Sequence, residues 1–433
     1  IRVAARYVGD SALVDVTRAG TAAPTQRLAS RKGALPYVNL APSFMELASM
    51  HAKRTVGDST IVYYFVVGAG QTLPATFKWI AADSAVMNIG GVELRLHLDA
   101  RGRILHGNVP SQNVTIERAA GTLNRGSDAA PDYSAPANAG YTAEDVTVRT
   151  SAGHVIAGTL TLPKRRTGKI PAAITISGSG PQDRDEALVI VRGYRPFREI
   201  AEALAAHGVA TLRYDDRGFG GSTGLYGEAT SADFAEDARA VLAYLRTRPE
   251  IDSDRIFLIG HSEGGMIAPM VAAQDPALRG IVLLAGPAWT GRKILEYQTR
   301  NSVDLQPGKT KTQRDSLYRA GLLTLDSLVN YQPWVKYFYS YDPLPVVSKV
   351  RTPVLILQGA TDRQVAAEQA TILANALRAS GNTNVALHVL PDVNHLFLSD
   401  PVGNVSGYTA LTTRKVVPQV LQLVSDWIAD KSK

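Results

Sequence analysis

The 433-residue chain contains no cysteine, which excludes disulfide bonds, thiolate metal sites and a cysteine nucleophile. It also lacks the apolar run of about 18 residues that a membrane-spanning helix needs. Apolar stretches such as 61–67 and 281–286 have only the length of strands. Hydrophobic residues make up 45% of the chain and charged residues 20%, which is ordinary for a globular protein. We therefore expect a globular chain without membrane insertion.

Basic residues are in modest excess, with a formal net charge of +7. Lys and Arg are scattered, and the densest run, PKRRTGK at 163–169, is short and lies between two strand patterns. This placement favours a solvated loop over a phosphate-binding patch, so we expect no nucleic-acid partner. The oligomeric state is not predicted by any pattern.

The first residue is Ile1 rather than Met. We expect an exported protein, periplasmic or secreted, whose signal peptide has been removed, with a cytoplasmic location as the alternative. The absence of cysteine fits both locations.

Two kinds of pattern divide the chain. Residues 1–120 are predicted to form a smaller, strand-rich domain, and residues 121–140 a linker rich in Ala, Gly, Ser, Asn and Pro. Within the first domain, a helical stretch is expected over 42–54. Strands are expected over 61–67, 76–82, 92–100, 103–109 and 113–119, the third and fourth of these forming a hairpin.

From residue 141 to 433, apolar strands alternate with helices, which indicates an α/β domain with a mostly parallel sheet flanked by helices. The first two strands are expected to pair antiparallel. Residues 290–349 are too long for a plain connection, so we expect a helical cap insertion there. Its aromatic cluster at 334–343 is predicted to form the insertion's own core, the alternative being a pocket lining.

The pattern G-x-S-x-G occurs twice, around Ser222 and around Ser262. In an α/β sheet with hydrolase chemistry, a serine nucleophile stands on a sharp turn from a strand into a helix, with glycines two residues before and after it. GHSEGG at 260–265 follows the apolar strand RIFLI and precedes a helical stretch, whereas GGSTG at 220–224 leads into LYGEATS, which has no helical character. We therefore predict that Ser262 is the nucleophile and that Ser222 is structural.

A serine needs a base, and in this order of elements the acid and the histidine follow it. Of the two later histidines, His388 lies within a strand pattern, while His395 lies in the loop PDVNHLF just beyond it and is the predicted base. Asp362 follows the next-to-last strand and is the predicted acid. Asp342, in the insertion, is the reserve, and Asp392 precedes His395 too closely to reach its ring.

The oxyanion hole requires two N–H donors. One is predicted to be the backbone N–H of Glu263, directly after the nucleophile. The other is expected from the loop SGSGPQDRDE at 177–186, where we choose Ser179, with Gly180 in reserve.

These motifs together resemble bacterial serine esterases of the α/β-hydrolase superfamily, in the branch close to dienelactone hydrolases, acyl-CoA thioester hydrolases and prolyl-oligopeptidase-type peptidases. The resemblance covers roughly 141–433. It is carried by ISGSGPQDRDE, RYDDRGFGGS, GHSEGG, QGATDR and DVNHLF. It implies an α/β-hydrolase fold, a triad of Ser262, Asp362 and His395, acyl-enzyme chemistry, and no cofactor or metal. Many relatives carry His-Gly where this chain has Ser177-Gly178.

We therefore expect a carboxylesterase-type serine hydrolase that acts on a small-molecule ester. A peptidase or amidase with the same triad is the first alternative, although about 120 N-terminal residues are too few for the propeller that restricts access in prolyl-oligopeptidase relatives. An acyl-CoA thioesterase is the second, because the basic charge suits acidic acyl carriers. A non-catalytic binding protein on this scaffold is least favoured, since all three triad positions have candidates.

Overall fold

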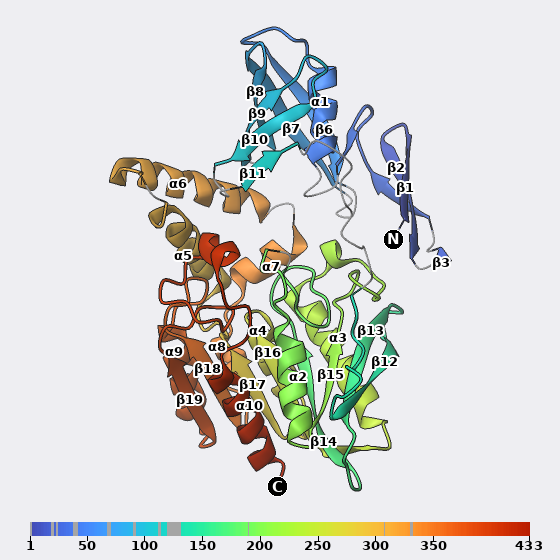
Figure 1. Ribbon diagram of the computed structural model, residues 1–433, viewed down its shortest axis with the longest axis vertical. Coiled ribbons are helices and arrows are strands. Elements are labelled where there is room, and N and C mark those ends of the chain that lie inside the picture. Colours follow the sequence, from blue (N-terminus) through green and yellow to red (C-terminus); the bar gives the residue numbers. More distant parts are fainter. Residues whose placement is uncertain are drawn as a thin grey trace. The chain divides into compact units, whose positions relative to one another are not determined.

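The chain divides into two compact units, Ile1–Ala129 and Ala130–Lys433 (Figure 1). The computed structural model describes residues 2–18, 21–22, 25–37, 42–66, 71–89, 92–110, 114–118, 131–188, 190–306, 308–329 and 332–433. Of the predicted linker, residues 121–130 lie outside the described residues, as do residues 67, 113 and 119 at the ends of predicted strands.

The first unit is strand-rich, as predicted. Its strands form a four-stranded sheet in which β1, β3 and β4 pair with β2, and a seven-stranded sheet in the order β11-β10-β9-β8-β7-β6-β5. The bounds are β1 (Arg2–Val8), β2 (Ser11–Arg18), β3 (Thr21–Ala22), β4 (Gln26–Ala29), β5 (Leu35–Tyr37), β6 (Ser59–Val66), β7 (Gln71–Ala81), β8 (Ser84–Ile89), β9 (Val92–Leu98), β10 (Ile104–Val109) and β11 (Val114–Glu117).

The five predicted strands of this unit are confirmed as β6, β7, β9, β10 and β11, and the predicted hairpin is the antiparallel pair β9–β10. Strands β1 to β5 and β8 were not predicted. The predicted helix over 42–54 is shorter, since it consists of the 3-10 turn η1 (Pro42–Phe44) and α1 (Glu46–His51). In β9, Leu94, Leu96 and Leu98 are buried while Arg95 is exposed, which explains the alternating sequence.

The second unit is built on an eight-stranded sheet in the order β12-β13-β15-β14-β16-β17-β18-β19. Strands β12 and β13 pair antiparallel, as predicted, and β13 pairs antiparallel with β15, while every later pair is parallel. The bounds are β12 (Tyr141–Arg149), β13 (Val155–Pro163), β14 (Ile170–Ile176), β15 (Ala210–Tyr214), β16 (Ile251–His261), β17 (Gly280–Leu284), β18 (Val354–Gly359) and β19 (Val385–Leu390).

Helices cover both faces of this sheet and enclose one apolar core on each. Helices α2 (Pro196–Ala206) and α10 (Pro418–Lys431) pack on one face, and α3 (Ser231–Arg246), α4 (Gly264–Ala272) and α9 (Glu368–Ala379) pack on the other. The central strands are fully buried because both faces are covered, which explains why their sequences are continuous apolar runs. The predicted α/β-hydrolase fold is thereby confirmed.

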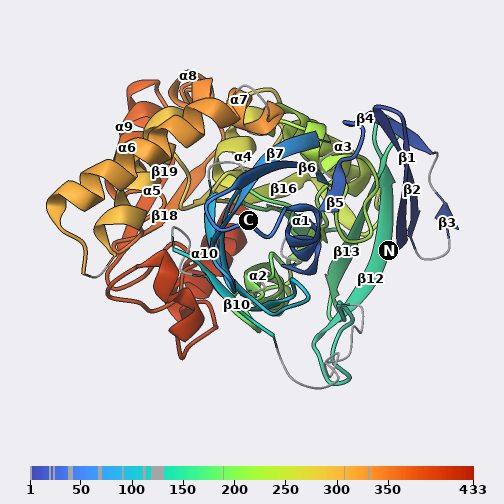
Figure 2. The same cartoon turned by 90° about the horizontal axis from the view of Figure 1, so that it is seen from above.

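The insertion between β17 and β18 is helical, and its helices gather beside α9 in Figure 2. They are α5 (Gly291–Asp304), α6 (Lys311–Leu328), α7 (Pro333–Ser340) and α8 (Leu344–Val347). In the aromatic cluster, Phe338 stacks on Trp334 with ring centroids 4.9 Å apart. Phe338 is buried in the same core as the sheet strands and helices α3 and α4, so the cluster is not the separate core of the insertion that the sequence predicts. In the part of the chain that the structure describes, no helix is long and apolar enough to cross a membrane.

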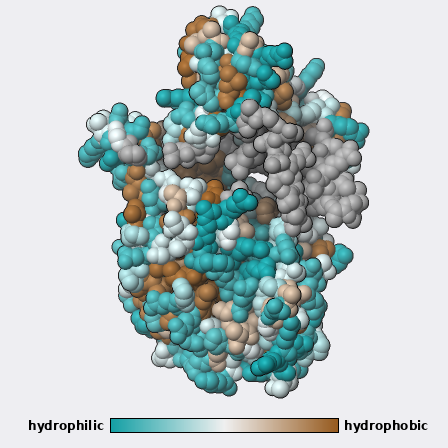
Figure 3. All heavy atoms as spheres, in the orientation of Figure 1, coloured by the Kyte–Doolittle hydropathy of each residue, from teal (hydrophilic) through white to brown (hydrophobic). Residues whose placement is uncertain are grey.

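The surface of the second unit intersperses hydrophilic and hydrophobic residues on the face drawn in Figure 3. A hydrophobic area lies on this face, over the C-terminal strands. Among the exposed apolar side chains of the unit is Val389 of β19. Single exposed apolar side chains of this kind are normal on a globular surface.

Candidate active site

Ser262 stands on a sharp turn between β16 and α4, with φ of 53°, in the left-handed region that a residue with a Cβ rarely adopts. The glycines on either side make this turn possible. A Cβ added to Gly260 would overlap the carbonyl oxygen of Gly264, and one added to Gly264 would overlap that of Ile176. The Ser262 N–H donates to the Leu284 carbonyl at 2.8 Å, which ties the turn to the neighbouring strand. The local structure is therefore that of a nucleophile elbow.

Ser222, the other serine of the pattern, is fully buried. Its hydroxyl donates to the Asp215 carbonyl at 2.7 Å and accepts the Ala157 N–H at 2.9 Å. Because both bonds hold loop backbone in place, Ser222 has a structural role, in agreement with the prediction.

Asp362 and His395 lie in the loops after β18 and β19, and the structure brings them together. His395 Nδ1 donates to Asp362 Oδ2 at 2.7 Å, and both residues are buried. The backbone N–H groups of Gln364 and Val365 hold Asp362 Oδ1 at 2.7 and 2.9 Å, while the Gln358 amide donates to Oδ2 at 2.9 Å. These bonds fix the carboxylate toward the imidazole, which leaves Nε2 as the proton-accepting nitrogen.

The other candidates lie apart from this pair. Asp342 accepts the Leu344 N–H at 3.1 Å at the start of α8. His388 and Asp392 are exposed, the first on the edge strand β19.

Within the described residues, Ser262 Oγ and His395 Nε2 are not joined by a hydrogen bond. The two loops are nevertheless adjacent, since His261, the residue before Ser262, has its ring centroid 5.0 Å from that of His395. Such catalytic hydrogen bonds are often long without substrate.

The predicted oxyanion loop, 177–186 after β14, approaches Ser262 closely, because a Cβ on Gly178 would lie 3.2 Å from Ser262 Cβ. The Gly178 N–H itself is occupied, since it donates to Glu186 Oε1 at 2.7 Å. The backbone of Gly180 interacts with the phenol oxygen of Tyr226. Ser179 is exposed, and its N–H has no acceptor within the residues that the structure describes. Of the two predicted donors from this loop, Ser179 is therefore the better placed.

Charged residues of DRDE and RYDDR hold this loop by pairing with one another across the sheet edge. The Arg184 guanidinium donates to both carboxylate oxygens of Asp215, at 3.1 and 2.8 Å, and Arg213 forms a buried ion pair with Asp185. RYDDRGFGGS is therefore structural.

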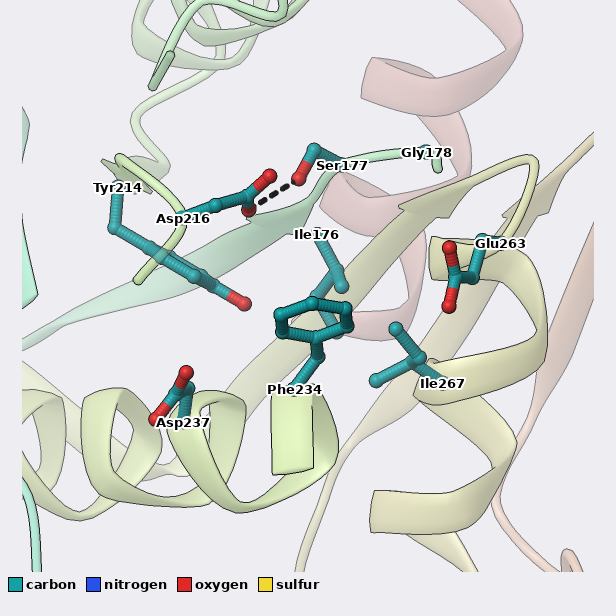
Figure 4. Close-up of a pocket in the computed structure, with 9 residues that line it drawn as sticks. All are labelled: Ile176, Ser177, Gly178, Tyr214, Asp216, Phe234, Asp237, Glu263 and Ile267. Carbon is teal, nitrogen blue, oxygen red and sulfur yellow. Dashed lines mark hydrogen bonds between the residues drawn. The ribbon is translucent and has the colours of Figure 1, made fainter. Parts of the chain in front are cut away.

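The Glu263 side chain turns into a small pocket beside the elbow, lined by both apolar and polar side chains (Figure 4). Its Oε1 accepts the Ser231 hydroxyl at 2.5 Å and the Trp334 indole N–H at 2.7 Å. Burial raises the pKa of Glu263 to about 7, although these two hydrogen bonds act to lower it. The residues lining the pocket are Ile176, Ser177, Gly178, Tyr214, Asp216, Phe234, Asp237, Glu263 and Ile267.

Sequence reasoning missed three buried side chains near the elbow, namely Asp216, Glu186 and His261. Asp216 accepts the Ser177 hydroxyl at 2.7 Å, and Glu186 lies 2.9 Å from His261 Nδ1. All three stand inside the motifs quoted above, but their pairing joins distant segments and no local pattern shows it. Among the described residues, no group of three or more His, Asp or Glu side chains is arranged to hold a metal ion.

The chain is similar in sequence to known hydrolases. The model of a family described as serine aminopeptidase, S33, matches residues 184–402, about half of the chain. Esterase EstD of Thermotoga maritima is 30% identical over 276 residues, which are 62% of this chain and 63% of EstD, so the chain spans less than two thirds of that relative. Monoglyceride lipase of Mus musculus is 29% identical over 232 residues, 47% of this chain and 75% of the lipase. A solved esterase of Pyrococcus furiosus is 18% identical, with a TM-score of 0.47, over 68% of this chain and 92% of that chain.

Proposed function

The chain belongs to the serine aminopeptidase S33 family, and from this premise we propose that it is a serine hydrolase that cleaves carboxylic esters through an acyl-enzyme. The observation that carries the proposal is the 2.7 Å bond between His395 and Asp362, in loops adjacent to a serine with φ of 53°. The similarity to an esterase and a monoglyceride lipase supports an ester substrate of small to medium size.

Acylation begins with Ser262. His395 Nδ1 is committed to Asp362, so Nε2 carries the free lone pair and takes the proton of the Ser262 hydroxyl as the oxygen attacks the ester carbonyl. Asp362 holds the tautomer and stabilises the imidazolium that forms. The same imidazolium then protonates the departing alcohol.

Backbone donors hold the tetrahedral oxyanion. We assign them to the N–H groups of Ser179 and Glu263, since Gly178 already donates to Glu186. Losing one such donor typically costs about 2.7–4 kcal/mol of transition-state stabilisation. Water then enters, gives its proton to His395 and attacks the acyl carbon. The imidazolium returns that proton to Ser262 Oγ as the acyl–oxygen bond breaks, which releases the acid and restores the enzyme.

The cap insertion contributes a wall beside the elbow. Trp334 of α7 donates its indole N–H to Glu263 at 2.7 Å, which supports the proposal that residues 290–349 help to shape the substrate pocket.

The decisive assay compares the wild type with Ser262→Ala on short-chain p-nitrophenyl esters, an acyl-CoA and an aminoacyl anilide. We expect ester turnover by the wild type and its loss in Ser262→Ala, with Ser222→Ala as the matched control from the other serine motif. Equal ester turnover by the wild type and Ser262→Ala would remove Ser262 as the nucleophile. Faster turnover of the anilide than of every ester would favour an aminopeptidase, which the description of the family suggests.

A further inference from the structure

One buried ion pair connects the three loops of the proposed active site. Glu186 Oε1 accepts the Gly178 N–H at 2.7 Å and lies 2.9 Å from His261 Nδ1. On the other side of the same ring, His261 Nε2 lies 2.9 Å from the carbonyl oxygen of His395. The pair thus contacts the oxyanion loop at Gly178, the elbow directly before Ser262, and the loop of the proposed base.

Hydrogen-bond chemistry determines the protonation state of this ring. The His395 carbonyl oxygen can only accept, so His261 Nε2 must carry a proton. Glu186 Oε1 already accepts the Gly178 N–H, so the Nδ1 that faces it is a donor as well. A neutral imidazole has only one N–H, and both contacts are therefore satisfied when His261 is an imidazolium.

The surroundings make this charge depend on Glu186. His261 and Glu186 are 5% and 2% exposed, and Glu186 Oε2 has no hydrogen-bond partner within the described residues. Burial lowers the pKa of His261, but the Glu186 carboxylate outweighs it, together with the His395 carbonyl and Asp362, so that the pKa lies above its ordinary value. The other groups facing the pair are the His395 ring against His261, and Tyr194 and Asp216 near Glu186.

We propose that Glu186 and His261 are positioning residues. They hold the oxyanion loop, the nucleophile elbow and the His395 loop in fixed positions relative to one another, and they do so only while both ring nitrogens of His261 carry a proton. The inference rests on the proposed function, because the relative positions of these three loops matter only if the loops act together on one substrate.

A dependence on pH follows. The His261 pKa is raised by folding, so the stabilisation is complete below the ordinary histidine value and is lost as the pH rises through the raised pKa. Turnover is therefore expected to fall on the alkaline side. When His261 loses its Nδ1 proton, Glu186 loses the contact that holds it against both the ring and the Gly178 N–H.

The test compares pH–rate profiles of the wild type, Glu186→Gln and His261→Asn on a p-nitrophenyl ester. In Glu186→Gln we expect kcat to fall by about 10- to 100-fold with KM little changed, because a buried hydrogen-bond network loses its charge. The alkaline limb is expected to move to lower pH by at least about one unit, since the carboxylate that favours the imidazolium is gone. Glu263 titrates in both proteins. Glu186 raises the pKa of Asp216, so Glu186→Gln also lowers that pKa, and His261→Asn, which keeps Glu186, separates the two contributions.

His154→Asn is the matched control, because His154 Nε2 pairs with buried Asp237 at 2.7 Å but contacts none of the three loops. We expect it to keep the alkaline limb of the wild type. An alkaline limb that stays in place in Glu186→Gln, or that moves equally in His154→Asn, would overturn the proposal.

Two further measurements keep the test decisive. If Glu186→Gln and His261→Asn do not fold, as judged by circular dichroism, the ¹⁵N signals of His261 in the wild type are read instead. We expect both ring nitrogens to be protonated at a pH below the ordinary histidine value, and a single protonated nitrogen there would overturn the proposal. Failure of the proposed function is distinguishable, because Ser262→Ala would then retain turnover whatever the state of His261.

Discussion

The structure predicts that the charge of Glu263 affects stability near neutral pH. Its carboxyl group is buried beside the elbow, and burial raises its pKa from 4.5 to about 7. Replacement by Gln removes the titration but keeps an oxygen that can accept from Ser231 and Trp334. The perturbation therefore isolates the cost of ionising one buried group.

The magnitude follows from proton linkage. The folded protein holds the Glu263 proton up to about pH 7, whereas the unfolded chain releases it near pH 4.5. The stabilisation from the protonated form is thus complete below pH 4.5 and lost as the pH rises to about 7, at 1.36 kcal/mol per unit, which sums to about 3 kcal/mol. For a unit of this size, that free energy corresponds to a change of about 5 °C in Tm.

The assay is differential scanning calorimetry of the wild type and Glu263→Gln at a series of pH values. We expect the Tm of the wild type, measured relative to that of Glu263→Gln, to fall by about 5 °C between pH 4.5 and 7 and to stay level above it. Glu228→Gln, at an exposed glutamate, controls for the substitution itself. A Tm difference that is constant over the whole range would refute the reasoning, because it would mean that Glu263 has the same proton affinity in both states.

Two other predictions concern the site. Asp362→Asn should lower kcat by about 10⁴-fold without changing the fold, because the amide favours the wrong tautomer of His395. Steady-state kinetics measures the loss of kcat and circular dichroism checks the fold. A loss of kcat below tenfold would contradict the prediction. Ser222→Ala should destabilise the protein by about 1–3 kcal/mol, since it leaves the Ala157 N–H and Asp215 carbonyl unpaired, while kcat stays near that of the wild type. Thermal melting and ester turnover measure the two effects, and a large loss of kcat in a well-folded Ser222→Ala would contradict the structural role.

The sequence predicts the second unit well because its signals are local. Buried parallel strands such as 354–359 are continuous apolar runs, and the glycines at 260 and 264 mark a turn that no other residue could fill. The pairing of Asp362 with His395 followed from the order of elements alone. By contrast, β3 has two residues and β5 has three, too few for a period-2 pattern to show.

Side-chain pairs that join distant segments could not be predicted. Glu186 and His261 are separated by 75 residues in the sequence. Each lies in a motif whose local pattern indicates only a polar turn. The choice between Ser179 and Gly180 also required the folded structure. Gly180 interacts with Tyr226 only when the loop that follows β15 packs against the oxyanion loop. Long-range polar contacts of this kind have no periodicity, and only the fold brings their partners together.

The departure at Ser177, where many relatives carry histidine, can be understood through Asp216. The Ser177 hydroxyl donates to Asp216 Oδ1 at 2.7 Å and the Gln182 N–H donates to Oδ2 at 2.9 Å, so one carboxyl group holds the loop at both Ser177 and Gln182. Burial raises the pKa of Asp216 well above its ordinary value, and Glu263 and Glu186 act in the same direction, although both hydrogen bonds oppose the shift. Asp216 thus fixes the loop at Ser177 and Gln182, Glu186 fixes it at Gly178, and Ser179 lies between these contacts with no acceptor for its N–H among the described residues. The small hydroxyl at 177 therefore helps to hold the loop that carries the proposed donor.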